Sequence, residues 1–271
     1  MAQISDRVNR LAASATFAML QKSNELSAQG VDVVNMSVGE PDFNTPDYVK
    51  KAAVEAVEQN YSKYSPVPGY MWLRKACSDK LKRENNLEYA PAEILVSTGA
   101  KQSLCNVIMA IINPGDEVLL PSPCWVSYPE MVKLAGGVPV VIKAGIDQDF
   151  KVTAAQVEAA ITPKTKAIMI CSPSNPTGSV YTKDELESIA KVLGKYPDVF
   201  IISDEIYEHI NFIGGHNSLA QFVDKDRIAV INGVSKAYAM TGWRHSWQAY
   251  HCCTCYCRNR AEDASDGGEQ D

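Results

Sequence analysis

The sequence predicts an α/β protein in which helices sandwich a mostly parallel sheet. Two observations lead to this prediction. Short apolar runs bounded by turn residues recur between residues 94 and 231, and segments with helical spacing of apolar residues separate most of them. The runs are apolar at consecutive positions, which is typical of strands that are covered on both faces. Because parallel strands need helix-length connections, the alternation favours a parallel sheet with helices on both sides.

Each element can be justified from its local pattern. Pro46 and Asp47 open an amphipathic stretch that continues to about residue 59, and a second covers residues 70–85. The apolar runs that follow are expected to be strands, and the amphipathic segments among them helices. The expected strands are 94–96, 117–120, 138–142, 167–171, 199–202 and 228–231, and the expected helices are 101–112, 127–134, 154–161 and 184–193.

Length and composition exclude several classes of protein. The 271 residues include 26 basic and 32 acidic side chains, a net charge of −6, and 46% are hydrophobic. This composition is typical of a globular chain of one large or two ordinary domains. Mild acidity disfavours nucleic acid or an anionic membrane as the main partner. No segment reaches the ~20 apolar residues of a membrane helix or resembles a secretory signal. We therefore expect a cytoplasmic protein with no nucleic-acid and no membrane partner.

The eight cysteines fall into two groups. Cys77, Cys105, Cys124 and Cys171 are scattered, whereas the other four are crowded into residues 252–257. Scattered cysteines in a chain without an export signal are typically reduced and buried as small hydrophobic residues. We expect the first group to be free thiols.

Polar residues follow four of the expected strands. They form the segments 97–101, 172–178, 203–205 and 232–236. Ligands of open α/β sheets bind beyond the carboxyl ends of the strands, so these segments are expected to converge on one site.

Two of these polar residues suggest cofactor chemistry. A lysine such as Lys236, between small residues at a strand end, can be partly desolvated, which lowers its pKa and lets its amine form a Schiff base. Taken alone, Lys236 is more typical of a solvated loop lysine than of a Schiff-base lysine. Asp204 could cap a helix, or it could hold the protonated pyridine nitrogen of pyridoxal phosphate.

Three further residues have a plain and a functional interpretation. Asn175 lies in a tight Asn-Pro-Thr-Gly turn, which leaves its amide free to bind a ligand. Gly99 precedes an expected helix whose N-terminus either is simply capped or binds a phosphate. Arg244 could grip a phosphate through its bidentate fork or be solvated.

Six motifs carry a resemblance to a known family. They are Val38-Gly39-Glu40-Pro41-Asp42-Phe43, Tyr64-Ser65-Pro66, Pro123-Cys124-Trp125-Val126-Ser127-Tyr128-Pro129, Ser172-Pro173-Ser174-Asn175-Pro176-Thr177-Gly178, Ser203-Asp204-Glu205-Ile206-Tyr207 and Ser235-Lys236-Ala237-Tyr238-Ala239-Met240-Thr241-Gly242-Trp243-Arg244. With these motifs in order, residues 14–244 resemble the fold-type I pyridoxal-phosphate aminotransferases, specifically the class I group of bacterial aspartate aminotransferases. The resemblance implies the large domain of this fold, with an incomplete small domain, and pyridoxal 5′-phosphate as the cofactor.

The resemblance also implies roles for individual residues. Lys236 would form the Schiff base and move the proton of the substrate Cα. Asp204 would bind the pyridinium nitrogen, Asn175 and Tyr207 the phenolic oxygen, and Trp125 would stack on the ring. Lys236, Asp204 and Tyr207 would thus be the catalytic residues. The phosphate would be held by Gly99, Ala100, Lys101, Arg244 and Tyr64 of the partner subunit, which implies a homodimer.

The implied reaction moves an amino group between an amino acid and a 2-oxo acid. Aspartate and 2-oxoglutarate are favoured, with prephenate, aromatic or other neutral amino acids as alternatives. The implied substrate-binding residues are Gly39, Trp125, Asn175, Lys101, Thr16 and Ser14. Other functions compatible with the resemblance are a pyridoxal-phosphate-binding regulatory module without turnover and a lyase of the same fold. A serine hydrolase built on residues 233–237 is disfavoured, because Ala237 replaces the last glycine of the nucleophile elbow.

Three regions are expected along the chain: an N-terminal arm with part of a small domain (1–42), an incomplete cofactor-binding large domain (43–244) and a disordered tail unlike the family (245–271). The motif pattern stops after Arg244, and residues 245–271 contain no Leu, Ile, Val, Met or Phe. We therefore expect no strand from them. Family members continue for more than about a hundred residues beyond this point. The resemblance therefore implies an interrupted chain, and it leaves open whether this chain is active.

Three interpretations of residues 245–271 stand side by side. A frameshifted or otherwise aberrant end fits the abrupt loss of pattern best. A zinc site is suggested by the Cys-x-x-Cys spacing of Cys252 and Cys255, but a second spaced pair is missing, so no metal is expected. A natural disordered tail is the third.

Overall fold

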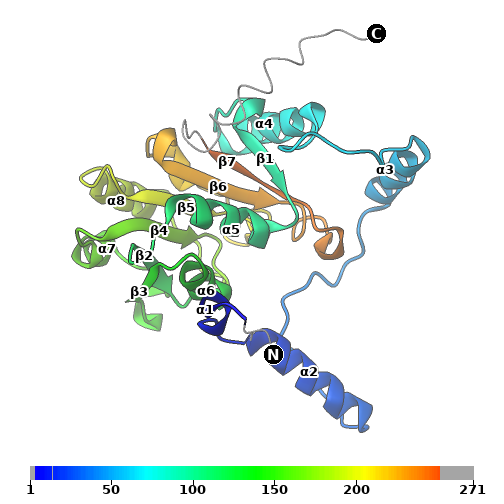
Figure 1. Cartoon of the computed structure of the whole chain (residues 1–271), viewed down its shortest axis with the longest axis horizontal. Coiled ribbons are helices and arrows are strands. Elements are labelled where there is room, and N and C mark those ends of the chain that lie inside the picture. Colours follow the sequence, from blue (N-terminus) through cyan, green and yellow to red (C-terminus); the bar gives the residue numbers. More distant parts are fainter. Residues whose placement is uncertain (1–3, 14, 251–271) are drawn as a thin grey trace.

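A seven-stranded sheet with helices on both sides forms the centre of the molecule (Figure 1). The computed structural model describes residues 4–13 and 15–250. The strand order is β1-β7-β6-β5-β4-β2-β3. Neighbouring strands are parallel except that β7 runs antiparallel to both β1 and β6. The predicted α/β class with a mostly parallel sheet is therefore confirmed.

The expected strands and helices in the region 46–231 lie within two residues of those observed. The strands are β1 (Ile94–Ser97), β2 (Glu117–Ser122), β3 (Val138–Lys143), β4 (Thr165–Cys171), β5 (Phe200–Asp204), β6 (Ile228–Gly233) and β7 (Ser246–Tyr250). The helices are α1 (Asp6–Asn9), α2 (Ala15–Ala28), α3 (Asp47–Glu58), α4 (Met71–Asn85), α5 (Ala100–Ile111), α6 (Ser127–Leu134), α7 (Ala154–Ala160) and α8 (Lys183–Leu193).

Two apolar clusters, one on each face, hold the sheet between its helices. Residues of β4 alternate between them: Ile168 and Ile170 pack with α7 and α8, whereas Ala167 and Met169 pack with α5 and α6. All four are almost fully buried. This two-sided burial explains why the strands are apolar at consecutive positions, since each face of a buried strand must exclude water.

Capping residues define where helices α7 and α8, which cover one face of the sheet, begin. The hydroxyl of Thr182 accepts a hydrogen bond from the backbone N–H of Glu185, whose carboxylate accepts one from the N–H of Thr182. Thr153 and Gln156 form the same reciprocal pair at the start of α7. Such pairs satisfy backbone donors that the first helical turn leaves free.

Strand β7 corrects one expectation. Residues 245–271 were expected to supply no strand, but Ala249 of β7 lies opposite Ile94 of β1 and Val230 of β6. The expectation is wrong for Ser246–Tyr250, because Trp247 and Ala249 supply buried apolar surface without Leu, Ile, Val, Met or Phe and both neighbouring strands offer backbone partners. Residues 251–271, including the cysteines of the zinc interpretation, lie outside the described residues.

The polar residues of β7 are buried with partners. Ser246 Oγ lies 3.0 Å from Ser103 Oγ, and Gln248 Oε1 accepts a hydrogen bond of 3.2 Å from Ser97 Oγ. These contacts tie β7 to β1 and to α5. Buried polar groups with partners cost little, so the strand fits a position that its polarity alone would disfavour.

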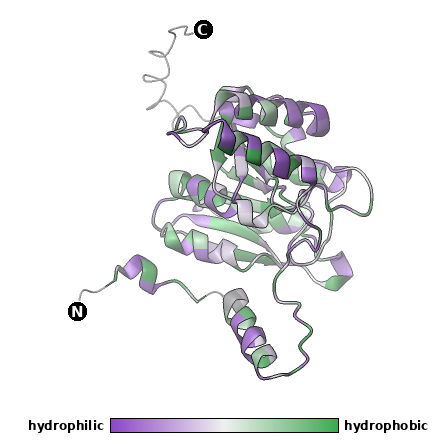
Figure 2. Ribbon diagram, turned by 90° about the vertical axis from the view of Figure 1, so that its right-hand side faces the viewer, coloured by the Kyte–Doolittle hydropathy of each residue, from purple (hydrophilic) through white to green (hydrophobic). Residues whose placement is uncertain are grey.

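The N-terminal part lies beside the sheet rather than on it. Helix α2 stands away from the body in Figures 1 and 2, helix α3 projects from it in Figure 1, and an irregular segment joins the two helices. This segment exposes Val34, Met36 and Phe43. The domain boundaries at 42/43 and 244/245 stay predictions, although β7 places five residues beyond the second boundary within the large sheet.

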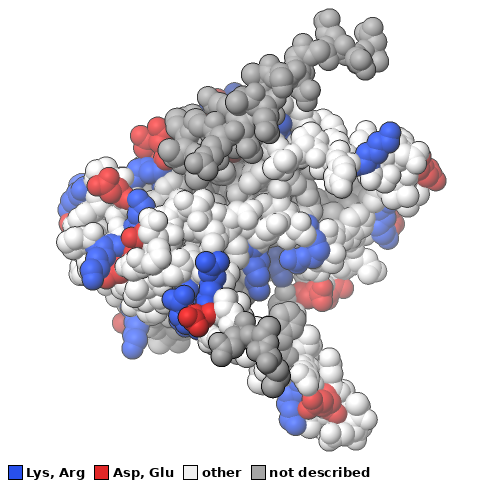
Figure 3. Space-filling view, in the orientation of Figure 1, with Lys and Arg blue, Asp and Glu red and all other residues white. Residues whose placement is uncertain are grey.

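The described residues bear on three further expectations: membrane-spanning helices, surface charge and the state of the cysteines. Among the described residues, no helix is both long and apolar enough to cross a bilayer. Basic and acidic side chains are both spread over the face drawn in Figure 3. Within residues 4–13 and 15–250, the four scattered cysteines form no disulfide, as expected, with Cys77 buried and Cys105, Cys124 and Cys171 half-buried.

Candidate active site

The ends of β1, β4, β5 and β6 bring the predicted residues to one edge of the sheet. Asn175 follows β4, and its Nδ2 donates a hydrogen bond of 2.9 Å to the hydroxyl of Tyr207, which follows β5. The Nζ of Lys236, after β6, lies 5.9 Å from the centre of the Tyr207 ring. Parallel strands place their carboxyl ends at the same edge, so side chains far apart in sequence meet there.

Asp204 is the buried acid of this edge. It ends β5 with 3% of its surface exposed. The hydroxyl of Tyr128 donates to its Oδ2 at 2.6 Å, and the N–H of Ile206 donates to its Oδ1 at 3.3 Å. Burial raises the pKa of Asp204 to about 6, although both hydrogen bonds act against the rise. The carboxylate is therefore ionised at neutral pH and ready to face a cation.

Tyr128 is a site residue that the sequence did not single out. It lies on α6, is buried and touches Trp125 edge-on, with ring centres 5.6 Å apart. A tyrosine among apolar residues of a helix is usually a core residue, so nothing in its local pattern indicated a bond to Asp204. Only the packing of α6 against the sheet reveals it.

Replacing Tyr128 with phenylalanine is expected to raise the pKa of Asp204 further in the cofactor-free protein. The variant keeps the ring but removes a hydrogen bond that favours the carboxylate, and such bonds to charged groups contribute about 1.5–3 kcal/mol, or roughly one to two pH units. The measurement is the titration of the Asp204 carboxyl carbon by NMR. Tyr196→Phe, at a tyrosine remote from Asp204, is the matched control, and an unchanged midpoint in Tyr128→Phe would contradict the assignment.

Lys236 is half-buried, and its amine has a partner. Its Nζ donates a hydrogen bond of 2.6 Å to the carbonyl oxygen of Gly39. Burial lowers the pKa of Lys236, while the charge of Glu40 acts in the opposite direction. A desolvated lysine holds more of its neutral, nucleophilic form than a solvated one, as its position in the sequence predicted.

The segment that carries Gly39 lies along the loop that carries Lys236. Thr45 donates a hydrogen bond of 2.6 Å to the carbonyl of Ala239, and the hydroxyl of Thr241 donates to the carboxylate of Glu40. Gly39 is thereby held beside Lys236, and its role as a substrate-binding residue stays a prediction.

A cationic cradle lies where β1 passes into α5. Gly99 caps α5 with a φ of +85°, which favours glycine. A Cβ at Gly99 would lie 2.6 Å from Nη2 of Arg244, which donates to the carbonyl of Thr98 at 3.4 Å. The guanidinium therefore lies at the positive end of the α5 dipole. The guanidinium of Arg244 and the N-terminus of α5 together suit an anion such as phosphate.

The remaining predicted residues have different places. Ala100 is the first residue of α5, and the Nζ of Lys101 lies 4.8 Å from the centre of the Trp125 ring. Tyr64 is fully exposed to solvent within this single chain. Thr16 lies in α2, which projects from the body (Figure 1), and Ser14 lies outside the described residues.

Comparison with known proteins identifies relatives with the same sequence pattern. An aspartate aminotransferase of Bacillus sp. (strain YM-2) is 51% identical over 249 residues, which cover 91% of this chain and 63% of that protein. An aspartate/prephenate aminotransferase of Cereibacter sphaeroides is 48% identical over 252 residues, with 92% and 63% covered. The chain spans about 60–63% of the length of the curated relatives it matches.

Solved structures share the fold. The Thermus thermophilus aspartate aminotransferase with maleate is 45% identical with a TM-score of 0.89, covering 92% of this chain and 65% of that one. The aspartate aminotransferase of Rhizobium meliloti is 37% identical with a TM-score of 0.91, covering 98% and 67%. The family model described as aminotransferase class I and II matches residues 31–265, which extends past Arg244. With this match over most of its length and these site residues at one sheet edge, the chain belongs to the class I and II aminotransferase family.

Proposed function

We propose that this protein is a pyridoxal-phosphate-dependent aminotransferase that moves an amino group between an amino acid and a 2-oxo acid. The observation that carries the proposal is the joint placement of three groups at one sheet edge. These are the buried carboxylate of Asp204, the partly desolvated amine of Lys236 and the cationic cradle of Arg244. Family membership points to the same chemistry.

The residues of the site fit the cofactor that the family uses. Arg244 and the N-terminus of α5 suit its phosphate, and Asp204 suits its protonated ring nitrogen. Trp125 offers a ring face for stacking, and Asn175 and Tyr207 offer polar hydrogens for its phenolic oxygen. Burial raises the pKa of Tyr207 to about 12, so its hydroxyl keeps its proton. When bound, pyridoxal phosphate withdraws electrons from the carbon that loses a proton.

The chain's own residues then position and move protons. The amine of Lys236 would hold the cofactor covalently until the amino group of the substrate displaces it. The freed amine would then take the proton from the substrate Cα and deliver it to the cofactor carbon. Asp204 keeps a negative charge beside the ring nitrogen and so keeps that nitrogen protonated. Tyr128 holds the Asp204 carboxylate in place through its hydrogen bond.

Aspartate and 2-oxoglutarate are the substrates that we propose first. The four relatives and solved structures described above are all named for aspartate, and the Thermus thermophilus structure is described as containing maleate, a dicarboxylate. An ammonium group such as that of Lys101, beside Trp125, suits a distal carboxylate. Gly39, Trp125, Asn175 and Thr16 complete the proposed substrate contacts. Prephenate is the second candidate substrate, because several relatives are named for both aspartate and prephenate.

We also propose that the active form is a homodimer. Tyr64 is fully exposed within one chain, and the same stretch of sequence also exposes Val67 and Trp72. Large exposed apolar side chains that cluster in this way are typical of interfaces. In the dimer, Tyr64 of the partner subunit would complete the phosphate cradle.

The proposal is tested with the purified full chain and pyridoxal phosphate. We expect a yellow complex, a borohydride-stable label on Lys236 by peptide mass spectrometry, and conversion of aspartate and 2-oxoglutarate to oxaloacetate and glutamate. A complex without turnover would favour the regulatory module, and release of ammonia the lyase. The absence of any label on Lys236 would refute the cofactor assignment.

Replacing Gly99 with alanine is expected to weaken cofactor binding by about tenfold or more, because the added methyl displaces Arg244 and strains a positive φ. Gly115→Ala is a matched control, since Gly115 has a φ of +91° and an added methyl meets no atom within 4 Å. Dissociation constants from the quenching of tryptophan fluorescence by the cofactor provide the measurement. Equal affinities in the two variants would count against the cradle.

A further inference from the structure

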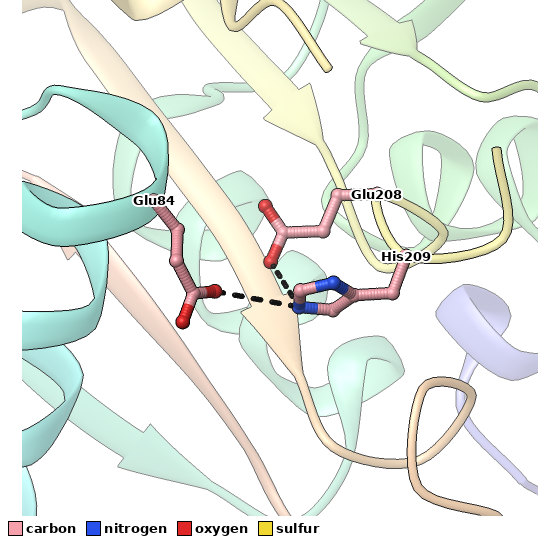
Figure 4. Close-up of side chains that lie close together, drawn as sticks. All are labelled: Glu84, Glu208 and His209. Atoms are coloured by element: carbon pink, nitrogen blue, oxygen red, sulfur yellow. Dashed lines mark ion pairs between the residues drawn. The ribbon is translucent and has the colours of Figure 1, made fainter. Parts of the chain in front are cut away.

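Two groups of ionisable residues involve close sequence neighbours of Tyr207, one around Glu208 and one around Glu205. Figure 4 shows one group, in which Nε2 of His209 lies 3.5 Å from Glu84 and 3.1 Å from Glu208. Nζ of Lys80 also contacts Glu208, and Asn85 donates a hydrogen bond of 2.6 Å to it. Lys80 and Asn85 lie on α4, and Lys80 supplies the positive charge opposite the carboxylate of Glu208. This group is therefore an ion-pair network that ties Glu208 to α4.

A second group surrounds Glu205, which is 1% exposed. Its Oε1 accepts hydrogen bonds from the hydroxyls of Ser203 at 2.8 Å and Ser218 at 2.6 Å, and its Oε2 lies 2.9 Å from Nε2 of His216. The carboxylate thus joins the end of β5 to a segment more than ten residues later in the chain. We call Ser203, Glu205, His216 and Ser218 the Glu205 cluster.

The two groups flank Tyr207 along the chain. Glu205 lies two residues before it and Glu208 one residue after it, and the side chains of both are held by hydrogen bonds to other segments of the chain. Backbone bonds close the turn between them: the N–H of Glu208 donates to the carbonyl of Glu205 at 3.1 Å, and that of Ile210 to the carbonyl of Tyr207 at 2.8 Å. Tyr207, whose hydroxyl accepts a hydrogen bond from Asn175, therefore lies on a turn that is held by the side chains of Glu205 and Glu208. We expect the orientation of its hydroxyl to depend on both of these side chains.

We propose that the Glu205 cluster positions Tyr207 and that His216 is a positioning residue of the active site. A buried carboxylate with a hydrogen-bonded cationic partner is strongly held, whereas one that loses its partner must shift or take up a proton. Protonated His216 therefore holds the turn that carries Tyr207, and loss of its charge loosens this turn. The inference rests on the proposed function for its effect on the cofactor.

The cluster makes this hold dependent on pH. Burial alone lowers the pKa of His216, but the hydrogen bond and charge of Glu205 and the charge of Glu208 outweigh it and raise the pKa, with Lys80 opposing them. Among the described residues, the charge of Glu205 also acts on the titratable groups of Asp204 and Tyr89. Because the pKa of His216 is raised in the fold, its stabilising charge is fully present below the usual 6.5 and disappears as pH rises through the folded value.

The first test needs no cofactor. The full chain is labelled at histidine ring carbons and tyrosine Cζ, His216 and Tyr207 are assigned with His216→Gln and Tyr207→Phe, and both signals are followed against pH. We expect His216 to titrate above 6.5 and the Tyr207 signal to move with the same midpoint. In Glu205→Gln, His216 is expected to titrate lower and Tyr207 to stop following it.

Glu158→Gln is the control, because Glu158 pairs with Lys195 at the surface and is not among the groups whose charges act on His216. It should leave the His216 midpoint and the Tyr207 response unchanged. A His216 midpoint at or below 6.5, or a Tyr207 signal that ignores the His216 titration, would overturn the proposal. Should Glu205→Gln fail to fold, the wild-type titration alone decides.

The second test reads the cofactor. His216→Gln and Glu205→Gln are expected to raise the cofactor dissociation constant about two- to tenfold, as loss of one hydrogen bond does. They should also shift the pH midpoint of the bound cofactor's visible absorption in the direction that Tyr207→Phe shifts it. A purely structural role would lower the melting temperature and leave this midpoint in place, which would contradict the proposal. Failure of the wild type to bind cofactor would refute the proposed function but leave the first test valid.

Discussion

Replacing Lys236 with alanine is expected to lower transamination by at least about a thousandfold and to abolish the borohydride-stable label. The variant loses both the amine that attaches the cofactor and the group that moves the substrate proton, and positioned acid–base groups alone contribute about 10²–10⁴ in rate. The structure places this amine between Gly39 and the ring of Tyr207, within the convergence of strand ends. Initial rates with aspartate and 2-oxoglutarate provide the measurement.

The matched control for Lys236 is Lys195→Ala. Nζ of Lys195 forms a surface ion pair of 2.7 Å with Glu158, so its removal should change neither rate nor label. Added methylamine should restore part of the activity of Lys236→Ala, because a small amine can enter the space and move the proton. Activity of Lys236→Ala near that of the wild type would exclude Lys236 as the catalytic base.

Replacing Asp204 with alanine is expected to lower turnover by at least about 100- to 1,000-fold, the range seen when one group that stabilises the reacting charge is removed. Some cofactor binding should remain, because Arg244 and the α5 N-terminus still hold the phosphate. The ring nitrogen, however, would no longer stay protonated. Turnover at saturating substrate and the cofactor dissociation constant, measured together, separate the two effects.

Asp204→Asn distinguishes charge from shape. The amide keeps the size of the side chain and an oxygen that can accept the hydrogen bond from Tyr128, but it lacks the negative charge. We expect Asp204→Asn to lose nearly as much turnover as Asp204→Ala. An Asp204→Asn variant that retains most of its turnover would show that Asp204 acts only by filling space.

Local patterns were sufficient for much of the fold. The apolar runs of β4 and β5 and the helical spacing of α8 each lie within a short segment, so the sequence predicted them to within two residues. Strand β7 was not predicted from the sequence, because residues 246–250 contain no Leu, Ile, Val, Met or Phe. Their burial depends on the strands on either side. A strand that is stabilised mainly by its neighbours has a weak signal of its own.

The sequence by itself determined the α/β class, the family motifs and the residues Lys236, Asp204, Asn175 and Arg244 as site candidates, because these depend on local periodicity and on residue types that carry specific chemistry. The tertiary structure alone decided which side chains support them. Tyr128 reaches Asp204 across 76 positions of sequence, and Arg244 reaches Thr98 across 146. Glu205 likewise meets His216 only because the chain turns back after β5. Such contacts depend on how whole elements pack, and no short segment encodes the position of its distant neighbour.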